Sequence, residues 1–66
     1  MQIIINGQKK QIDDDLTINN LLQQLRVDIC QVAVEKNSEI IPRSNYEIVQ
    51  LADGDEVELV EFVGGG

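Results

Sequence analysis

The stretch Gln2-Ile3-Ile4-Ile5-Asn6-Gly7-Gln8-Lys9-Lys10-Gln11-Ile12 is a β-rich run on either side of an Asn-Gly pair. Asparagine and glycine both tolerate positive φ, so Asn6-Gly7 is a strong signal for a two-residue hairpin turn. We therefore predict strands over residues 2–5 and 8–12, joined into a hairpin that begins the fold.

A helix is predicted to follow the hairpin. Thr17 is placed to cap its start, and Leu16 and Leu21 have the spacing of a hydrophobic staple. The apolar positions recur with the period of an α-helix, so one stripe should face a sheet. That stripe consists of Ile18, Leu21, Leu22 and Leu25.

The rest of the chain is predicted to contain short strands separated by turn residues. Proline lacks a backbone N–H, so Pro42 is expected to end the short strand that precedes it. In chain order we expect a strand over 32–36, a turn at 37–38, a short strand at 40–41 that ends before Pro42, an irregular or single-turn helical stretch over 43–50, a turn at 53–55, and the longest strand over 56–63.

The predicted order is strand, strand, helix, strand, short strand, strand, without an internal repeat or linker. A hairpin and a helix that crosses a mixed sheet of about four to five strands make an α+β domain, with the helix on one face. The last strand is expected to be central and next to the first. We assign residues 1–63 to this domain and residues 64–66 to a flexible glycine tail.

Such a sheet leaves one face open, and side chains along residues 56–63 alternate between its two faces. If Val57 and Leu59 face the helix, Val60 and Phe62 project from the open face beside the glycines, where they would form a protein-docking patch. A bulge that changes the parity and buries Phe62 is an equal alternative from the sequence.

Composition restricts the class of partner. Twelve acidic and five basic residues give a net charge of −7, which would repel nucleic acid and anionic membranes. Tyr46 and Phe62 are the only aromatic residues, too few for a base-stacking platform. No apolar run approaches the roughly 20 residues of a membrane span, and the start lacks the pattern of a signal peptide. A soluble cytoplasmic protein is expected, without a nucleic-acid or membrane partner.

Catalysis by the chain itself has little support in the sequence. It has no histidine, a single cysteine and no phosphate-binding glycine loop, so a nucleophile and a base cannot be paired in the usual ways. Cys30 is interpreted as a small residue partly buried at the start of a strand. The chain is predicted to be acted upon and not to be an enzyme.

Two charged features have alternative interpretations. Asp13-Asp14-Asp15 lacks the alternating ligands of a calcium loop and is interpreted as a solvated loop near the positive end of the helix, not as a metal site. Arg43 would contact an acidic partner surface or pair with a neighbouring carboxylate, and pairing is the favoured interpretation.

The run Gly64-Gly65-Gly66 is the predicted working part. Without Cβ atoms it makes a thin thread with a reach of about 10 Å, able to enter a narrow cleft. It would carry an α-carboxylate that is ionised at neutral pH. The alternative is a frayed terminus without function.

Several stretches together match a known pattern. They are Met1-Gln2-Ile3 with Asn6-Gly7, residues 32–37 leading to 39–44, and Asp53-Gly54-Asp55 before the final strand and glycines. With these features, essentially the whole chain resembles the ThiS family, the small ubiquitin-like β-grasp sulfur carriers of thiamine thiazole biosynthesis. Ser38 stands where that pattern usually has glycine.

Two related classes fit the same residues less closely. The molybdopterin-synthase small subunit, MoaD, tends to be longer and often has prolines just before its terminal glycines. Ubiquitin-type modifiers usually have a basic residue before their diglycine. Glu61-Phe62-Val63 has neither feature. A MoaD-like subunit and a ubiquitin-like modifier remain the alternative functions.

The resemblance implies a mechanism and a set of partners. A ThiF-type enzyme would use ATP and magnesium to adenylate the Gly66 carboxylate, and a desulfurase system would supply the sulfur that leaves a covalent thiocarboxylate on Gly66. A ThiG-type thiazole synthase would then receive this sulfur, and the chain itself would bind no cofactor. The implied site residues are Gly66 for the reaction, Gly64 and Gly65 for clearance in a narrow channel, and Val60, Phe62 and Arg43 for docking.

Overall fold

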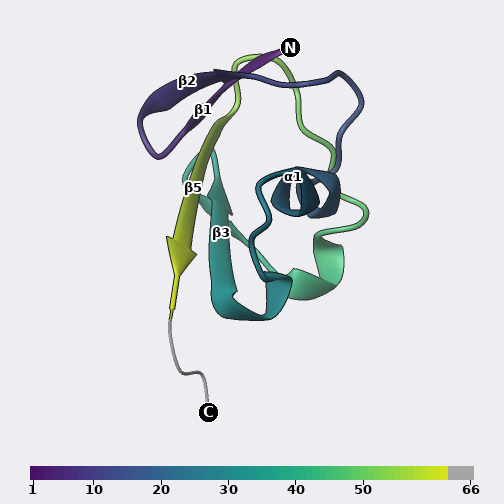
Figure 1. The fold of residues 1–66 in the computed structure, drawn as a ribbon, viewed down its shortest axis with the longest axis vertical. Coiled ribbons are helices and arrows are strands. Elements are labelled where there is room, and N and C mark those ends of the chain that lie inside the picture. Colours follow the sequence, from purple (N-terminus) through teal and green to yellow (C-terminus); the bar gives the residue numbers. More distant parts are fainter. Residues whose placement is uncertain (63–66) are drawn as a thin grey trace.

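The computed structural model describes residues 1–62, which form five strands, one α-helix and two short 3-10 helices (Figure 1). The predicted starts of these elements are met to within one residue, apart from the first 3-10 helix, which the sequence does not predict. The elements are β1 (Gln2–Ile5), β2 (Gln8–Gln11), α1 (Ile18–Gln24), η1 (Ile29–Gln31), β3 (Val32–Lys36), β4 (Glu39–Ile41), η2 (Arg43–Asn45) and β5 (Glu56–Glu61).

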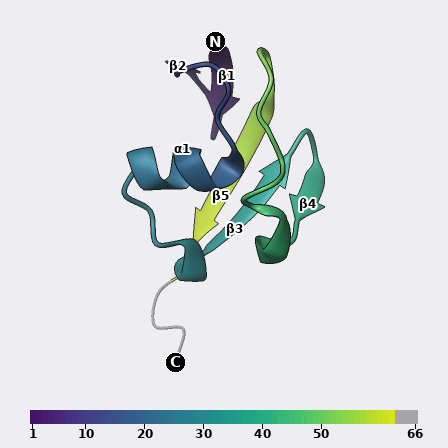
Figure 2. The same ribbon diagram turned by 90° about the vertical axis from the view of Figure 1, so that its right-hand side faces the viewer.

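The strands form one mixed sheet of order β2-β1-β5-β3-β4. Strand β5 is central: it pairs in parallel with β1 and antiparallel with β3. Helix α1 crosses one face of this sheet, as the two perpendicular views show (Figures 1 and 2). The predicted α+β arrangement, with the last strand beside the first, is confirmed.

Two hairpin turns have positive φ at both central residues. Asn6 and Gly7 lie at φ 49° and 79° between β1 and β2, which confirms the first predicted turn. Asn37 and Ser38 lie at φ 51° and 69° between β3 and β4. These values are those of the two-residue turns that suit the twist of antiparallel strands. Ser38 therefore adopts the left-handed backbone that glycine would adopt without steric cost.

The start of α1 is closed by a reciprocal capping box. The Thr17 Oγ1 accepts a hydrogen bond from the Asn20 N–H at 3.1 Å, and the Asn20 Oδ1 accepts one from the Thr17 N–H at 3.1 Å. Both bonds satisfy backbone donors that a helix start leaves without a partner. The predicted cap is confirmed, and it explains why a helix of seven residues begins at Ile18.

One side chain of the predicted apolar stripe of α1 lies outside the core. Ile18, Leu21 and Leu22 are fully buried, but Leu25 is 40% exposed. The helix ends at Gln24 because Arg26 turns to φ 58° and the Val27 N–H bonds back to the Leu22 carbonyl at 3.0 Å. This is the left-handed termination that glycine usually supplies. Leu25 thus lies at the rim of the apolar stripe.

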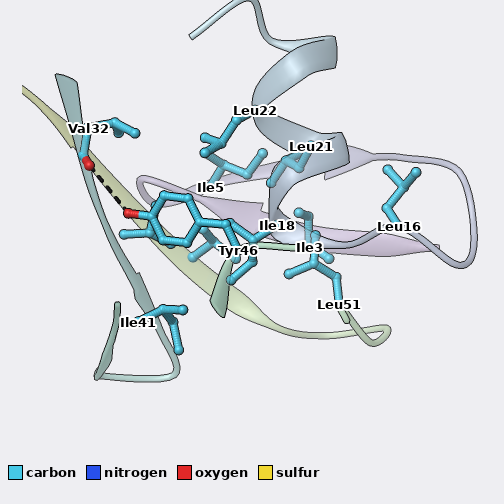
Figure 3. Packing of buried hydrophobic residues seen from close by; sticks show 12 residues of the cluster. Ile3, Ile5, Leu16, Ile18, Leu21, Leu22, Val32, Ile41, Tyr46 and Leu51 are labelled. Carbon is cyan, nitrogen blue, oxygen red and sulfur yellow. Dashed lines mark hydrogen bonds between the residues drawn. The ribbon is translucent and has the colours of Figure 1, made fainter. Parts of the chain in front are cut away.

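The core lies between α1 and the inner face of the sheet (Figure 3). Tyr46, which follows η2, is 2% exposed and its hydroxyl donates to the Val32 carbonyl at 3.3 Å. Burial raises the pKa of Tyr46, and the positive charge of Arg43 partly opposes this rise. The buried apolar side chains are Ile3, Ile5, Leu16, Ile18, Leu21, Leu22, Val32, Val34, Ile41, Tyr46, Leu51 and Val57.

A buried carboxylate braces the turn that leads into β5. Asp55 is 8% exposed, and its two oxygens accept hydrogen bonds from Asn37 Nδ2 at 3.0 Å and from the Ala52 N–H at 2.8 Å. The Asn37 Oδ1 in turn accepts from the Glu56 N–H at 2.9 Å. The two turns at 37–38 and 53–55 are therefore locked together at one end of the sheet.

Candidate functional site

The open face of the sheet carries an apolar patch at the end of β5. Val57 is 1% exposed and faces the helix, whereas Val60 and Phe62 are 58% and 43% exposed. Pairing with β3 continues without a bulge from Lys36↔Val57 to Val32↔Glu61. The predicted parity is therefore confirmed, and the alternative in which a bulge buries Phe62 is wrong. We call Val60 and Phe62 the docking patch.

The surface beside the docking patch is acidic. Glu35 lies opposite Glu58 in the β3–β5 register, and both lie on the open face because Val34 and Leu59 face the core. These two carboxylates line a shallow groove together with Ser38 and Glu56. In the next pair on the same face, Ala33 lies opposite Val60, so the carboxylates border the docking patch. An apolar patch with an acidic border is complementary to an apolar surface surrounded by basic residues.

The end of β5 is hydrogen-bonded on both sides by groups that the sequence analysis does not identify as site residues. On the β3 side, the Phe62 N–H donates to the Gln31 carbonyl at 3.0 Å. On the β1 side, the Asn6 side chain bonds both backbone groups of Leu59. The sequence identifies Asn6 only as a turn residue and does not single out Gln31. The Asn6-Gly7 pair predicts a turn, but it does not predict the direction of the Asn6 side chain.

Arg43 lies exposed in η2, away from the docking patch. The segment that follows η2 is tied to the start of α1, since the Asn19 N–H donates to the Tyr46 carbonyl at 2.9 Å. Arg43 therefore belongs to the helix side of the sheet, whereas Val60 belongs to the open face. The favoured interpretation, pairing with a carboxylate, is wrong for residues 1–62, where the one ion pair joins the Met1 amino group to Asp14 at 2.9 Å.

Cys30 is exposed and lies in η1, before the strand that it is expected to begin. The expected partial burial is wrong because Asp28 starts a helical turn here: its Oδ1 accepts from the Cys30 N–H at 2.9 Å. This turn keeps the thiol outside the sheet. Burial in β3 begins only with Val32, two residues later.

The acidic loop behaves as a set of surface carboxylates. Asp14 pairs with the Met1 amino group, and Asp13 accepts a hydrogen bond from Gln24 Nε2 at 3.4 Å. Within residues 1–62, no cluster of three His, Cys, Asp or Glu side chains has the arrangement of a metal site. The same part of the chain contains no helix long and apolar enough to cross a membrane.

The glycine run is the remaining part of the predicted site. Gly64, Gly65 and Gly66, together with Val63, lie outside the described residues. The domain boundary at residue 63, the tail over 64–66 and the roles assigned to the three glycines therefore stay predictions. What the structure does place is Phe62 of the docking patch, directly before Val63.

Comparison with known proteins decides the family, because the profile of the ThiS family matches residues 3–66. The chain belongs to the ThiS family. It is 45% identical over 53 residues to the sulfur carrier protein ThiS of Bacillus subtilis, a match that covers 80% of each chain. The crystal structure of ThiS from Geobacter metallireducens matches with a TM-score of 0.86 and 35% identity, over 100% of both chains. The expected ubiquitin-like β-grasp fold is thereby confirmed.

Longer proteins also contain a region similar to this chain. A thiazole synthase of Paramagnetospirillum magneticum is 46% identical over all 66 residues, and the chain spans 20% of that protein. It also spans 20% of a thiazole synthase of Magnetococcus marinus, at 36% identity. The chain thus corresponds to about a fifth of the length of these two relatives.

Proposed function

We propose that the chain is a sulfur carrier of thiamine biosynthesis whose Gly66 carboxylate is converted to a thiocarboxylate. The observation that carries this proposal is the ThiS family match over residues 3–66, which includes the whole glycine run. Relatives that carry the name sulfur carrier protein ThiS support it. The chain offers no histidine for acid–base work, which fits a protein acted upon by partner enzymes.

The chemistry follows from the low reactivity of a carboxylate. In the first step, an oxygen of the Gly66 carboxylate attacks the α-phosphorus of ATP and pyrophosphate leaves, which yields an acyl-adenylate. The persulfide of a sulfur donor then displaces AMP from the acyl carbon and forms an acyl disulfide. A thiol attacks the donor's sulfur in this disulfide, which forms a new disulfide with the donor and releases the terminal thiocarboxylate. A ThiF-type enzyme with magnesium would catalyse the first step, and a desulfurase system would supply the sulfur. Gly64 and Gly65 would pass a narrow channel because they lack side chains.

The proposed acceptor of the sulfur is a ThiG-type thiazole synthase. Two relatives named thiazole synthase contain, in one polypeptide, a region similar to the whole of this chain. Carrier and acceptor in one chain would work at high effective concentration, which supports a functional link between the two. The reaction partners are enzymes of small-molecule metabolism, so we expect a cytoplasmic location.

The docking patch is the proposed contact with these enzymes. Val60 on β5 and Phe62 directly after β5 lie exposed on the segment that leads to Gly66. A partner that covers the patch would therefore receive the tail beside it. Arg43 would make a separate contact at the helix side of the sheet.

Intact-mass spectrometry tests the proposal. The chain would be incubated with a ThiF-type enzyme, ATP, magnesium, a desulfurase and cysteine. We expect a mass increase that corresponds to exchange of one oxygen for sulfur, and none in a variant that lacks Gly66. An unchanged mass, when a known ThiS protein is converted by the same enzymes, would contradict the proposal.

A plain interaction module or ubiquitin-like modifier is the second candidate, favoured by the exposed docking patch. Such a protein would bind its partner equally well after deletion of Gly65 and Gly66, or would form isopeptide conjugates. A MoaD-like subunit differs in its acceptor enzyme. It would restore molybdoenzyme activity, whereas the proposed carrier restores growth without added thiazole.

A further inference from the structure

Strand β5 continues beyond the point where its neighbour β1 ends. The parallel pairing covers Ile4↔Glu56 and Ile5↔Val57, whereas β5 runs on to Glu61. At Leu59 the missing strand is replaced by one side chain. The Asn6 Oδ1 accepts from the Leu59 N–H at 2.8 Å, and Asn6 Nδ2 donates to the Leu59 carbonyl at 3.2 Å. The carboxamide thus makes the two bonds that a continuation of β1 would make to Leu59.

Asn6 can do this because its backbone belongs to the hairpin turn. At φ 49° it has already left the line of β1, and its side chain extends along β5 in place of the strand. Glycine would adopt the same backbone conformation but has no side chain to reach Leu59. Aspartate would keep an acceptor for the N–H of Leu59 but has no donor for its carbonyl. Asparagine satisfies both requirements.

The opposite edge of β5 is held by η1. The Phe62 N–H donates to the Gln31 carbonyl at 3.0 Å, while the Gln31 N–H bonds to the Asp28 carbonyl at 2.9 Å. The Asp28 side chain closes the same turn through the Cys30 N–H. In Figure 2 this turn lies beside the end of β5, at the side where the chain leaves the sheet. The last residues of β5 are therefore held from both sides.

We infer that Asn6 is a positioning residue for the reaction at Gly66, because its carboxamide fixes the end of β5 between the hairpin turn and η1. The inference rests on the proposed function. A partner that binds the docking patch must find the terminal carboxylate at a set distance from Val60 and Phe62. Freedom at the base of the tail would lower the fraction of encounters in which the carboxylate is aligned for attack. Asn6 limits that freedom through its two hydrogen bonds to Leu59.

The test compares Asn6→Gly, which keeps the turn but removes both bonds, with Asn6→Asp, which keeps one acceptor. Asp53→Ala is the matched control. It removes the hydrogen bond of 2.8 Å that the Gln2 N–H donates to the Asp53 Oδ1 at the opposite end of β1. Each full-length variant would be studied by amide hydrogen exchange. The rate of its adenylation by the activating enzyme would be measured at steady state from the release of pyrophosphate.

For Asn6→Gly we expect the Leu59 amide to exchange at least about tenfold faster, since its only described acceptor is lost. We expect kcat of adenylation to fall by about fivefold or more with little change in KM, because the docking patch is intact. Asn6→Asp should lie between Asn6→Gly and the unaltered chain. Asp53→Ala should leave kcat unchanged.

Two results would overturn the inference. One is unaltered exchange at Leu59 in Asn6→Gly, since the carboxamide would then hold nothing. The other is fast exchange with an unaltered kcat, since the end of β5 would then not matter for the reaction. Failure of the proposed function is a separate result, in which the unaltered chain itself is not adenylated. The exchange measurement would still show whether the Asn6 side chain protects the Leu59 amide.

Discussion

Glu35 and Glu58 lie directly opposite one another on β3 and β5, with both side chains on the open face of the sheet. Like charges at directly opposed positions weaken a strand pair. We expect Glu58→Gln to raise the free energy of unfolding by about 0.2–1 kcal/mol, and less at high salt because the repulsion is then screened. Urea unfolding at low and high salt measures both. Glu47→Gln, at an exposed position after η2, serves as control, and a loss of stability in Glu58→Gln would contradict the argument.

Ser38→Gly should stabilise the chain. Ser38 lies at φ 69°, where an L-residue is strained and glycine is not, so the expected gain is about 1 kcal/mol. The side chain of Ser38 makes no described hydrogen bond that the substitution would remove. Thermal unfolding of the two proteins, monitored by circular dichroism, would show a higher Tm for the variant. An equal or lower Tm would show that the strain is relieved elsewhere.

Tyr46→Phe should cost stability at neutral pH and less at alkaline pH. Loss of the hydroxyl bond to the Val32 carbonyl is expected to cost about 1 kcal/mol. The pKa of Tyr46 is raised in the folded chain, mainly by burial, above its ordinary value of 10.0. The stabilising effect of the neutral hydroxyl is therefore complete below pH 10.0 and decreases as the pH rises through the folded-state pKa.

Urea unfolding of both proteins from neutral to alkaline pH measures the difference between their free energies of unfolding. The lysines titrate alike in both proteins, so their effect cancels in this difference. The difference should narrow above pH 10.0. A constant difference would mean that the hydroxyl titrates alike in the folded and unfolded chains.

Phe62→Asp should weaken binding to the activating enzyme without unfolding the chain, because the side chain is 43% exposed on the open face. A central apolar contact of an interface typically contributes about 2 kcal/mol or more, so we expect the Kd to rise about thirtyfold. Isothermal titration calorimetry measures the change. Ile48→Asp places the same charge at a residue that is 71% exposed in the segment tied to α1. Equal loss in both variants would point to charge and not to the docking patch.

Gly65→Val should abolish adenylation and leave the stability of the domain unchanged. The two added methyl groups on Cβ would obstruct a narrow channel that only a glycine thread can enter. Pyrophosphate release with the activating enzyme gives the reaction rate, and thermal unfolding gives the stability. Gly65→Ala should show an intermediate rate. Normal adenylation of the valine variant would exclude a narrow channel.

Local sequence features are enough to predict most elements of the fold. The Asn6-Gly7 pair predicts the first hairpin because few residues accept positive φ, and Thr17 before an apolar stripe predicts the start of α1. The alternation along β5 correctly assigns Val57 to the core and Val60 to the open face. Each of these predictions depends on residues close together in the chain.

The errors concern residues whose surroundings the local pattern does not reveal. Leu25 fits the helical period, yet it is 40% exposed because the helix ends before it. Arg26 takes the left-handed conformation at this end, and the sequence has no glycine there that would indicate it. Cys30 is expected in a strand, but Asp28 caps a short turn there. Arg43 has carboxylates near it in sequence, yet none pairs with it within residues 1–62.

The order of the strands and helix and the positions of the turns follow from backbone preference and from the period of apolar residues, so they can be predicted without a structure. The groups that hold the end of β5 are visible only in the folded chain. Asn6 and Leu59 are separated by 53 positions, and no local preference of either residue favours the hydrogen bond between them. It exists because β1 and β5 lie side by side and β1 ends first, which leaves Leu59 within reach of one carboxamide.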